Sequence, residues 1–389
     1  MNPYPHALRS KLPNAGTTIF TVMSALAQEH NAINLSQGFP DFLCDERLMD
    51  KVNEHIRKGH NQYAPMPGLL RLREKIAEKA NDLYGIDVNP ETEVTVTSGG
   101  TQAIYCAITA LVHPGDEVVV IEPAYDCYVP TIELCGGRAV SVPLEAPLYK
   151  INWDRVKKMV NSKTRMIMVN TPHNPTGVVM TYDDMQQLKR IVRGTGIVIL
   201  SDEVYEHILF DGRKHESVLR DPELAEHSFA VYSFGKTYHN TGWKMGYCIA
   251  PAELMKEFRR VHQFVVFSSN TPMQHAFAEI MDDAEMYLSL PQFYQEKRDF
   301  FCKLLRDTPF TFTPAEGSYF QLVNYSNVSQ ESDKEFAVRL TKELGVASIP
   351  VSVFYRENYD KQMLRFCFAK QNETLERAVE RLVKLKIEA

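Results

Sequence analysis

The chain has 389 residues, of which 44% are hydrophobic and 24% charged, and its formal net charge is −6. This composition is typical of a globular protein with a large core, and the length predicts about two domains. The negative charge balance argues against nucleic acid or an anionic membrane surface as a partner, and no apolar run approaches the roughly 20 residues that span a membrane.

The seven cysteines are odd in number, scattered along the chain, and include no C-x-x-C pair. This pattern favours reduced thiols in a cytoplasmic protein over a disulfide framework or a zinc site, so no metal is expected. The first 15 residues lack the apolar segment of a secretory signal.

The first 45 residues are predicted to form an arm and a connector around a helix at 17–30. Apolar residues at helical spacing support that helix, and Gly38 before an aromatic residue and a proline marks a tight turn. Two further helices are predicted at 46–60 and 69–84, with a loop between them.

From residue 93 the pattern changes to short β-branched runs that alternate with helical segments. The predicted strands are 93–97, 117–121, 139–143, 165–170, 196–201, 228–232 and 246–250. The predicted helices between them are 102–112, 124–135, 152–160, 181–193 and 252–265. Continuous apolar strands separated by helices indicate an α/β fold, with a mostly parallel seven-stranded sheet between two layers of helices.

After residue 280 the pattern changes again. The predicted elements are a long polar helix at 284–306, strands at 310–313, 318–323 and 363–368, and helices at 332–344 and 372–386. We therefore predict a large α/β domain at 46–280 and a smaller α+β domain formed by 1–45 and 281–389.

Polar residues that could carry chemistry follow several of the predicted strands, where ligands bind in open α/β sheets. Lys236 lies in a predicted loop between two strands, among small residues that let the backbone approach a bulky phosphorylated group. A buried lysine amine with a lowered pKa suits Schiff-base chemistry with an aldehyde cofactor, although a solvated surface lysine is the commoner use of this residue.

Three further stretches have both a functional and a structural interpretation. Ser98–Ala103 places glycines and a hydroxyl at a helix N-terminus, which suits a phosphate or simply a turn. Tyr125 suits stacking on an aromatic cofactor or packing in the core. Asn174 is fixed between two prolines, either to donate a hydrogen bond to a phenolate oxygen or to form an Asx-turn.

Two charged residues lie in apolar surroundings. Asp202 follows a fully apolar strand, where an unpaired carboxylate is costly, so its partner is a cofactor pyridinium or a protein arginine. Arg365 is flanked by apolar residues and suits a substrate carboxylate held by its two-pronged guanidinium, or an internal ion pair.

The ordered set N-x-x-x-N-P-x-G, S-D-E-V-Y, S-x-G-K-x-x-x-x-x-G-x-K-x-G and R-F-C-F resembles class I aminotransferases of pyridoxal 5′-phosphate (PLP) fold type I. The segments 35–42 (LSQGFPDF), 61–63 and 349–355 (IPVSVFY) are similar to the methionine and kynurenine–glutamine aminotransferase branch. The resemblance extends over essentially the whole chain.

The resemblance implies that PLP is the cofactor and that Lys236 binds it covalently. Asp202 would face the ring nitrogen, Asn174 and Tyr205 would bond the 3′-oxygen, and Tyr125 would stack on the ring. The other implied cofactor-binding residues are Gly100, Thr101, Gln102, Ser233 and Lys244, with Tyr63 reaching in from a partner subunit. Lys244 departs from the arginine usual in the wider class, and His173 from the asparagine frequent in this branch.

The resemblance also implies that Arg365, Asn174 and the backbone of Gly38 bind the substrate carboxylate. Phe20 and Phe354 would line an apolar pocket, together with Phe39, Tyr63 and Tyr125. The expected function is ping-pong transfer of the amino group of an L-amino acid to a 2-oxo acid by a homodimer with shared active sites. Methionine is the favoured donor, with aromatic amino acids, glutamine or kynurenine as alternatives.

Three other functions fit the same motifs. A PLP-dependent cysteine-S-conjugate or C–S β-lyase uses the same fold and lysine. A PLP-binding regulatory protein is disfavoured because the chain has no additional helix-turn-helix segment or basic region. A catalytically inactive relative is disfavoured by the presence of Lys236, Asp202 and Arg365.

Overall fold

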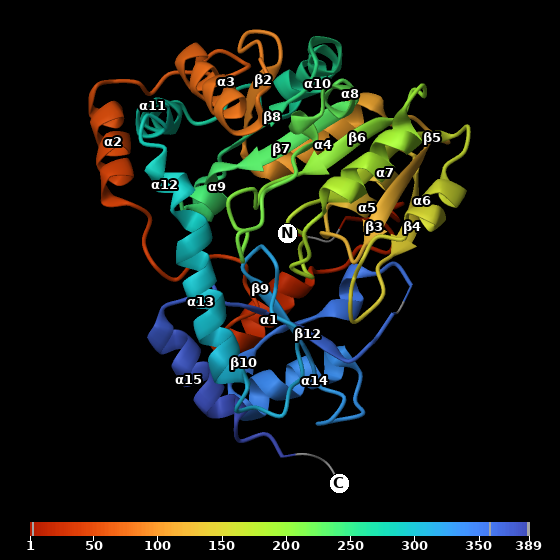
Figure 1. The fold of residues 1–389 in the computed structure, drawn as a ribbon, viewed down its shortest axis with the longest axis vertical. Coiled ribbons are helices and arrows are strands. Elements are labelled where there is room, and N and C mark those ends of the chain that lie inside the picture. Colours follow the sequence, from red (N-terminus) through yellow and green to blue (C-terminus); the bar gives the residue numbers. More distant parts are fainter. Residues whose placement is uncertain (2–3, 358, 387–389) are drawn as a thin grey trace.

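The structure is a computed structural model that describes residues 1, 4–357 and 359–386. Its centre is a seven-stranded sheet in which β8 alone runs antiparallel to its neighbours (Figure 1). The strands in spatial order are β2 (Val94–Thr97), β8 (Gly246–Ile249), β7 (Ser228–Ser233), β6 (Val198–Asp202), β5 (Thr164–Asn170), β3 (Glu117–Glu122) and β4 (Arg138–Pro143). The predicted mostly parallel α/β sheet is confirmed.

Helices cover both faces of this sheet, because successive strand residues are apolar on both sides. Val118 and Val120 belong to one core cluster, whereas Val119 and Ile121 belong to another. The first cluster includes α4 (Gly99–Leu111), α5 (Tyr128–Leu134) and α10 (Ala252–Val265). The second includes α3 (Leu70–Tyr84), α6 (Trp153–Met159), α7 (Tyr182–Val192), α8 (Pro222–Ala225) and α11 (Thr271–Ile280). The helix α2 (Glu46–Arg57) packs on α11.

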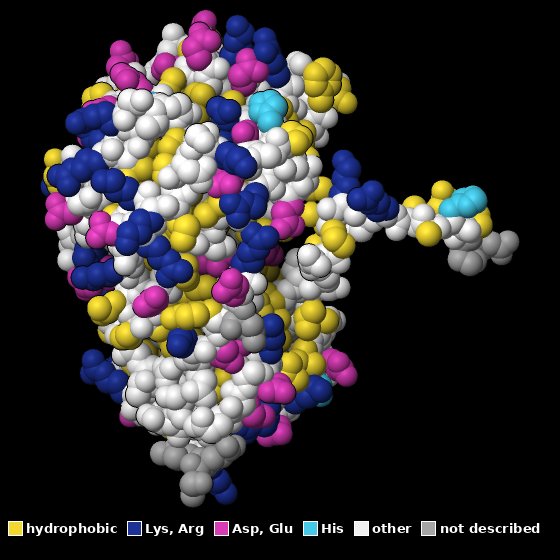
Figure 2. All heavy atoms as spheres, turned by 90° about the vertical axis from the view of Figure 1, so that its right-hand side faces the viewer, with side chains coloured by type: hydrophobic (Ala, Val, Ile, Leu, Met, Phe, Trp, Pro, Cys, Tyr) yellow, Lys and Arg dark blue, Asp and Glu magenta, His cyan; other side chains and the backbone are white. Residues whose placement is uncertain are grey.

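The N-terminal segment packs with the C-terminal part of the chain. Helix α1 (Ile19–Glu29) lies among the C-terminal elements in Figure 1, and Met23 and Leu35 share a core cluster with Phe336 and Leu364. The elements here are β1 (Ile33–Asn34) paired with β10 (Val346–Ala347), a sheet of β11 (Ile349–Pro350), β12 (Met363–Cys367) and β9 (Phe320–Asn324), α14 (Asp333–Arg339) and α15 (Asn372–Leu382). Residues 4–16 are mostly exposed and project as an arm (Figure 2).

Several predicted elements were wrong in detail. The predicted helix 284–306 is two helices, α12 (Glu285–Leu288) and α13 (Leu290–Leu305), because Pro291 fits only the first turn of a helix. The segment 310–313 is not a strand and makes one isolated bridge, from Thr311 to Asn324. The predicted helix 332–344 ends as a π-helix over Leu340–Leu344, and α11 was not predicted.

Lys236 lies in the short helix α9 (Phe234–Thr237) and not in a loop, and a 3₁₀ turn at Thr241–Trp243 follows it. The glycines near it admit the chain's own backbone. A Cβ on Gly235 would lie 2.9 Å from Thr241 Cα, and a Cβ on Gly246 would lie 2.6 Å from the carbonyl oxygen of Tyr232. The prediction that they make room for a phosphorylated group was therefore wrong for these two.

None of the described helices is both long enough and apolar enough to cross a membrane. On the face shown in Figure 2, acidic and basic side chains intermingle.

Candidate active site

A cavity of about 380 Å³ lies at the carboxyl ends of β5, β6 and β7, where β9, β12 and the N-terminal segment close over the sheet. It brings together most of the predicted site residues. Those that line it are Phe20, Gly38, Gly100, Thr101, Tyr125, Asn174, Asp202, Tyr205, Ser233, Lys236, Lys244 and Arg365. They come from segments more than 300 residues apart in sequence, so the fold and not local sequence assembles the site.

The amine of Lys236 is buried without a carboxylate partner among the described residues. Its Nζ donates hydrogen bonds to the Tyr319 hydroxyl at 2.8 Å and to the carbonyl oxygen of Gly38 at 3.1 Å. Burial lowers the pKa of Lys236 to about 8, and the positive charges of Arg365 and Lys244 act in the same direction. A substantial neutral fraction near neutral pH makes this amine a usable nucleophile and base.

Asp202 ends β6 and points into the same cavity. Its Oδ2 accepts a hydrogen bond from the Tyr128 hydroxyl at 2.6 Å, and burial raises the pKa of the carboxyl to about 6. A carboxyl group with a raised pKa, next to an open cavity, is stabilised as the anion by a cation that enters the cavity.

Arg365 in β12 is 1% exposed and forms no ion pair with a described residue. Its guanidinium donates to Asn174 Oδ1 at 2.9 Å and to the carbonyl oxygen of Ser36 at 2.7 Å, while Nε has no partner. The Phe320 ring lies 3.9 Å from its Cζ. Burial lowers the pKa of Arg365 to about 10, so the group remains a cation that lacks an anion.

The start of helix α4 forms another wall of the cavity. No side chain caps this helix at Ser98, and Gly100, Thr101 and Lys244 line the cavity beside it. Lys244 lies close to Gly99, where an added Cβ would lie 3.7 Å from Lys244 Cε. Free N–H groups, a helix dipole and a lysine together suit a phosphate.

The structure does not bring every predicted residue to the cavity. The Gln102 amide accepts from the Ser98 backbone N–H at 3.0 Å and contacts His262 at 3.1 Å, away from the lining. Phe354 lies behind the lining, 5.6 Å from the Arg365 guanidinium and 5.8 Å from the Phe20 ring. Tyr63 is 82% exposed, and Phe39 is 44% exposed and lies over Lys370.

Sequence reasoning missed several contacts of the site. Tyr128, which bonds Asp202, is the first residue of α5, three residues after the singled-out Tyr125, and its aromatic side chain in the same segment was the signal that could have found it. Tyr319 and Phe320 carry no recognisable motif and contact Lys236 and Arg365 only through the fold.

The family "Aminotransferase class I and II" matches residues 30–382, and the chain belongs to this family. Members are PLP-dependent, so the chain is a PLP-dependent aminotransferase of fold type I that acts on amino acids and 2-oxo acids.

The chain is 48% identical over 386 residues to the methionine aminotransferase of Escherichia coli K12, a match that covers 99% of this chain and 100% of the relative. It is 33% identical over 399 residues to human kynurenine–oxoglutarate transaminase 1, with 93% and 94% covered. The crystal structure of an Escherichia coli protein identified as a methionine aminotransferase has a TM-score of 0.96 at 49% identity, with 98% of this chain and 100% of that chain covered.

The residues present fit PLP. Its aldehyde would meet the amine of Lys236, whose pKa is lowered. Its cationic ring nitrogen would meet the buried carboxyl of Asp202. Its phosphate would meet Lys244 and the start of α4, which no side chain caps.

Proposed function

We propose that this enzyme transfers the amino group of an L-amino acid, with methionine as the preferred donor, to a 2-oxo acid by a ping-pong mechanism. The observation that carries the donor assignment is the wall around Arg365. Phe20 and Phe320 face the cavity there. Its described lining contains no cation besides Lys236, Lys244 and Arg365 to bind a carboxylate on the donor side chain. The name of the Escherichia coli relative supports the same donor.

Lys236 is assigned as the residue that binds the cofactor and acts as the general base. Bound PLP supplies the sink that stores the electron pair released when the Cα–H bond of the donor breaks. Nζ of Lys236 removes the Cα proton, and a pKa near 8 lets it hold and then release that proton near neutral pH. Tyr319 and the Gly38 carbonyl fix the direction of the amine.

The remaining roles are proposed from the family resemblance and are supported by the positions of the side chains. Asp202 holds the charge of the ring nitrogen, and Tyr128 orients its carboxylate. Asn174 and Tyr205 would bond the ring oxygen, and Tyr125 would stack on the ring. Arg365, Asn174 and the Gly38 backbone bind the α-carboxylate of the donor beside the ring of Phe20, and Phe354 packs behind Phe20. Gly100, Thr101, Ser233 and Lys244 would hold the phosphate, and Gln102 would contribute by bonding the Ser98 backbone at the start of α4.

The active enzyme is a homodimer in which Tyr63 completes the site of the partner subunit. Tyr63 packs against Phe267 at 5.4 Å, and these rings and Phe264 are 82%, 46% and 86% exposed. Such clustered exposed aromatic surface is typical of an interface. We further propose a cytoplasmic enzyme with a PLP-binding domain at 46–280 and a small domain formed by 1–45 and 281–389. Residues from both segments of this small domain belong to one core cluster.

The test is the visible absorption spectrum of the holoenzyme before and after addition of L-methionine without a 2-oxo acid. We expect the visible band of the bound cofactor to disappear while one equivalent of 2-oxo acid forms per site. A larger catalytic preference for aspartate than for methionine would contradict the donor assignment. Formation of ammonia and pyruvate from cystathionine at a rate above transamination would favour the C–S β-lyase instead.

A further inference from the structure

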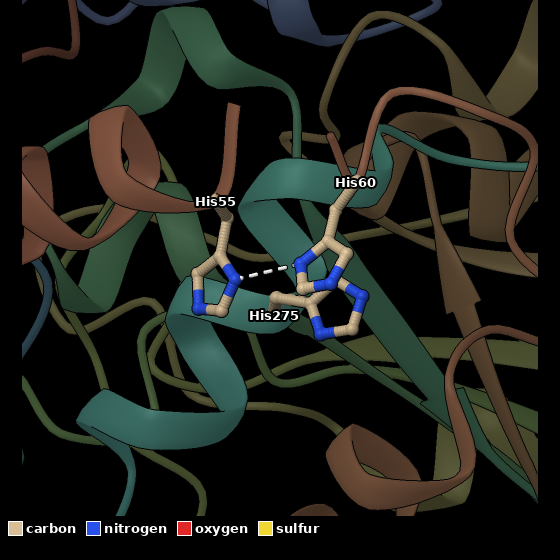
Figure 3. Close-up of side chains that lie close together, drawn as sticks. All are labelled: His55, His60 and His275. Atoms are coloured by element: carbon tan, nitrogen blue, oxygen red, sulfur yellow. Dashed lines mark hydrogen bonds between the residues drawn. The ribbon is translucent and has the colours of Figure 1, made fainter. Parts of the chain in front are cut away.

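Three histidines outside the active-site cavity lie together where α2 meets α11 (Figure 3). His55 is in α2, His60 follows that helix, and His275 is in α11. One potential ligand nitrogen of each lies within 4.8 Å of the others, and no second group of this kind is found among the residues that the structure describes. The ring centroids of His60 and His275 are 4.0 Å apart and those of His55 and His60 5.0 Å apart, and the ring planes differ by only 22° and 24°.

The hydrogen bonds around His55 fix the state of this cluster. Glu279 is held as an anion by Lys51, with a distance of 2.8 Å, so it can only accept the bond from His55 Nε2 at 2.9 Å. In neutral His55 the proton is therefore on Nε2, and Nδ1 is a hydrogen-bond acceptor. It accepts a hydrogen bond from His60 Nδ1 at 2.8 Å, as the dashed line in Figure 3 shows.

We propose that His55, His60 and His275 bind one divalent transition-metal ion of the zinc or copper type, with Glu279 orienting His55. Imidazole nitrogens are the preferred protein ligands of these ions, and three of them leave a fourth position for water. A ligand histidine that donates its other N–H to a carboxylate is the usual arrangement around such ions. The His55–Glu279–Lys51 chain already has this arrangement.

Binding of the ion requires the histidine side chains to turn, because the lone pair of an imidazole nitrogen lies in the plane of its ring. The stacked His60 and His275 rings, whose planes differ by 22°, must rotate about their side-chain bonds until both planes contain the ion. Two nitrogens on one tetrahedral zinc ion lie about 3.4 Å apart, since Zn–N bonds are about 2.1 Å, so His55 and His60 need to separate by about 0.6 Å. His60 moves its proton from Nδ1 to Nε2, which frees Nδ1 for the ion, and no net proton is lost. The nearby charges also balance, because Lys51 and Lys58 are paired with Glu54 and Glu279.

The bound ion would connect two helices that are distant in sequence, and none of its ligands lines the catalytic cavity. The inference is therefore independent of the proposed donor and of the catalytic roles. It predicts a metal that stabilises the α2–α11 contact and does not take part in transamination.

The test is titration of the chelator-treated holoenzyme with Zn²⁺ by calorimetry, and with Cu²⁺ followed by electron paramagnetic resonance. We expect one ion per chain, nitrogen hyperfine structure on the copper signal, and a higher thermal midpoint with Zn²⁺. His275→Gln and His60→Gln, two less buried positions than His55, should each weaken binding at least tenfold and remove the thermal shift. Glu279→Gln should weaken it by about 10- to 100-fold.

The matched control is His113→Gln, because the His113 side chain is 74% exposed and distant from this cluster in sequence. This variant should bind as the unchanged protein does, and all variants should retain the visible band of the cofactor as evidence of folding. Failure of the unchanged protein to bind either ion overturns the proposal. The proposal is also overturned if His275→Gln and His60→Gln bind the ions as strongly as the unchanged protein does, since the ions would then be bound by other groups such as thiols.

Discussion

The active-site cavity and a second buried charge cluster flank the end of β6, and they differ in how completely their charges are paired. In the cluster, Lys79 Nζ lies 2.5 Å from Glu206 Oε1 and 3.0 Å from the Tyr247 hydroxyl, and Tyr84 donates to the same carboxylate. Although burial opposes it, the charge of Lys79 helps to hold the pKa of Glu206 at about 2.

In the cavity a lysine and a carboxylate are also buried, but they form no ion pair. Lys236 bonds only a hydroxyl and a carbonyl oxygen, and burial raises the pKa of Asp202 to about 6. Burial of a lysine and a carboxylate therefore does not identify a catalytic site. What distinguishes the cavity is that its charged groups face open space and form no ion pair with a described residue, so that a ligand can supply the opposite charge.

Removing the lysine of the cavity should have the largest effect on function. Lys236→Ala should lower the rate of the methionine half-reaction by about 10²- to 10⁴-fold from loss of the proton transfer alone, and further because the covalent link to PLP is lost. Stopped-flow absorbance on the PLP-loaded protein measures this rate. Transamination by Lys236→Ala at the rate of the unchanged protein would refute the assignment of the site.

Breaking the ion pair of Lys79 and Glu206 should instead lower the stability of the fold. Lys79→Met leaves the Glu206 carboxylate buried without its cation, which should cost about 3–5 kcal/mol in the free energy of unfolding. Urea unfolding at saturating PLP measures the loss, and the visible band of the cofactor should be retained. The double variant Lys79→Met/Glu206→Leu should recover most of the stability. If the single variant lost the cofactor band without losing stability, the two regions would not be functionally distinct.

The sequence predicts the sheet well because its strands are continuous apolar runs, such as Val118–Ile121, that end at polar residues. Asn174, Asp202 and Lys236 could be placed at one edge for the same reason, since carboxyl ends of parallel strands meet there. The helical state of Lys236 was not predictable, because α9 is one turn long and its glycine favours a loop.

Contacts made by residues distant in sequence were not predictable either. Tyr319 reaches Lys236 across 83 residues, and the Ser36 carbonyl reaches Arg365 across 329. No local pattern records such contacts, because they depend on how β9, β12 and the N-terminal segment pack over the sheet. The sequence likewise left open an internal ion pair for Arg365, and the structure shows none with any described carboxylate.

The smallest expected effect concerns the pH dependence of cofactor capture. The reaction of apoenzyme with PLP needs the neutral amine of Lys236. Its pKa in the folded protein is about 8, below the ordinary 10.5, so the neutral fraction rises from pH 7 and is nearly complete by pH 9. The capture rate, followed by absorbance and by borohydride trapping, should therefore level off near pH 9. An exposed lysine would instead give a rate that rises to pH 10.5 and beyond.

A charge variant sharpens this test. Burial is the main cause of the lowered pKa, and the cation of Arg365 adds to it, so Arg365→Met should raise the pKa of Lys236 and shift the capture profile to higher pH. The matched change Arg298→Met removes a buried arginine that is already paired with Asp211 outside the cavity, and it should leave the profile in place. A profile centred at the ordinary lysine value in the unchanged apoenzyme would show that the amine of Lys236 is as well solvated as a surface lysine. Lys236 and Lys79 could then no longer be compared as two buried lysines that differ in whether they form an ion pair.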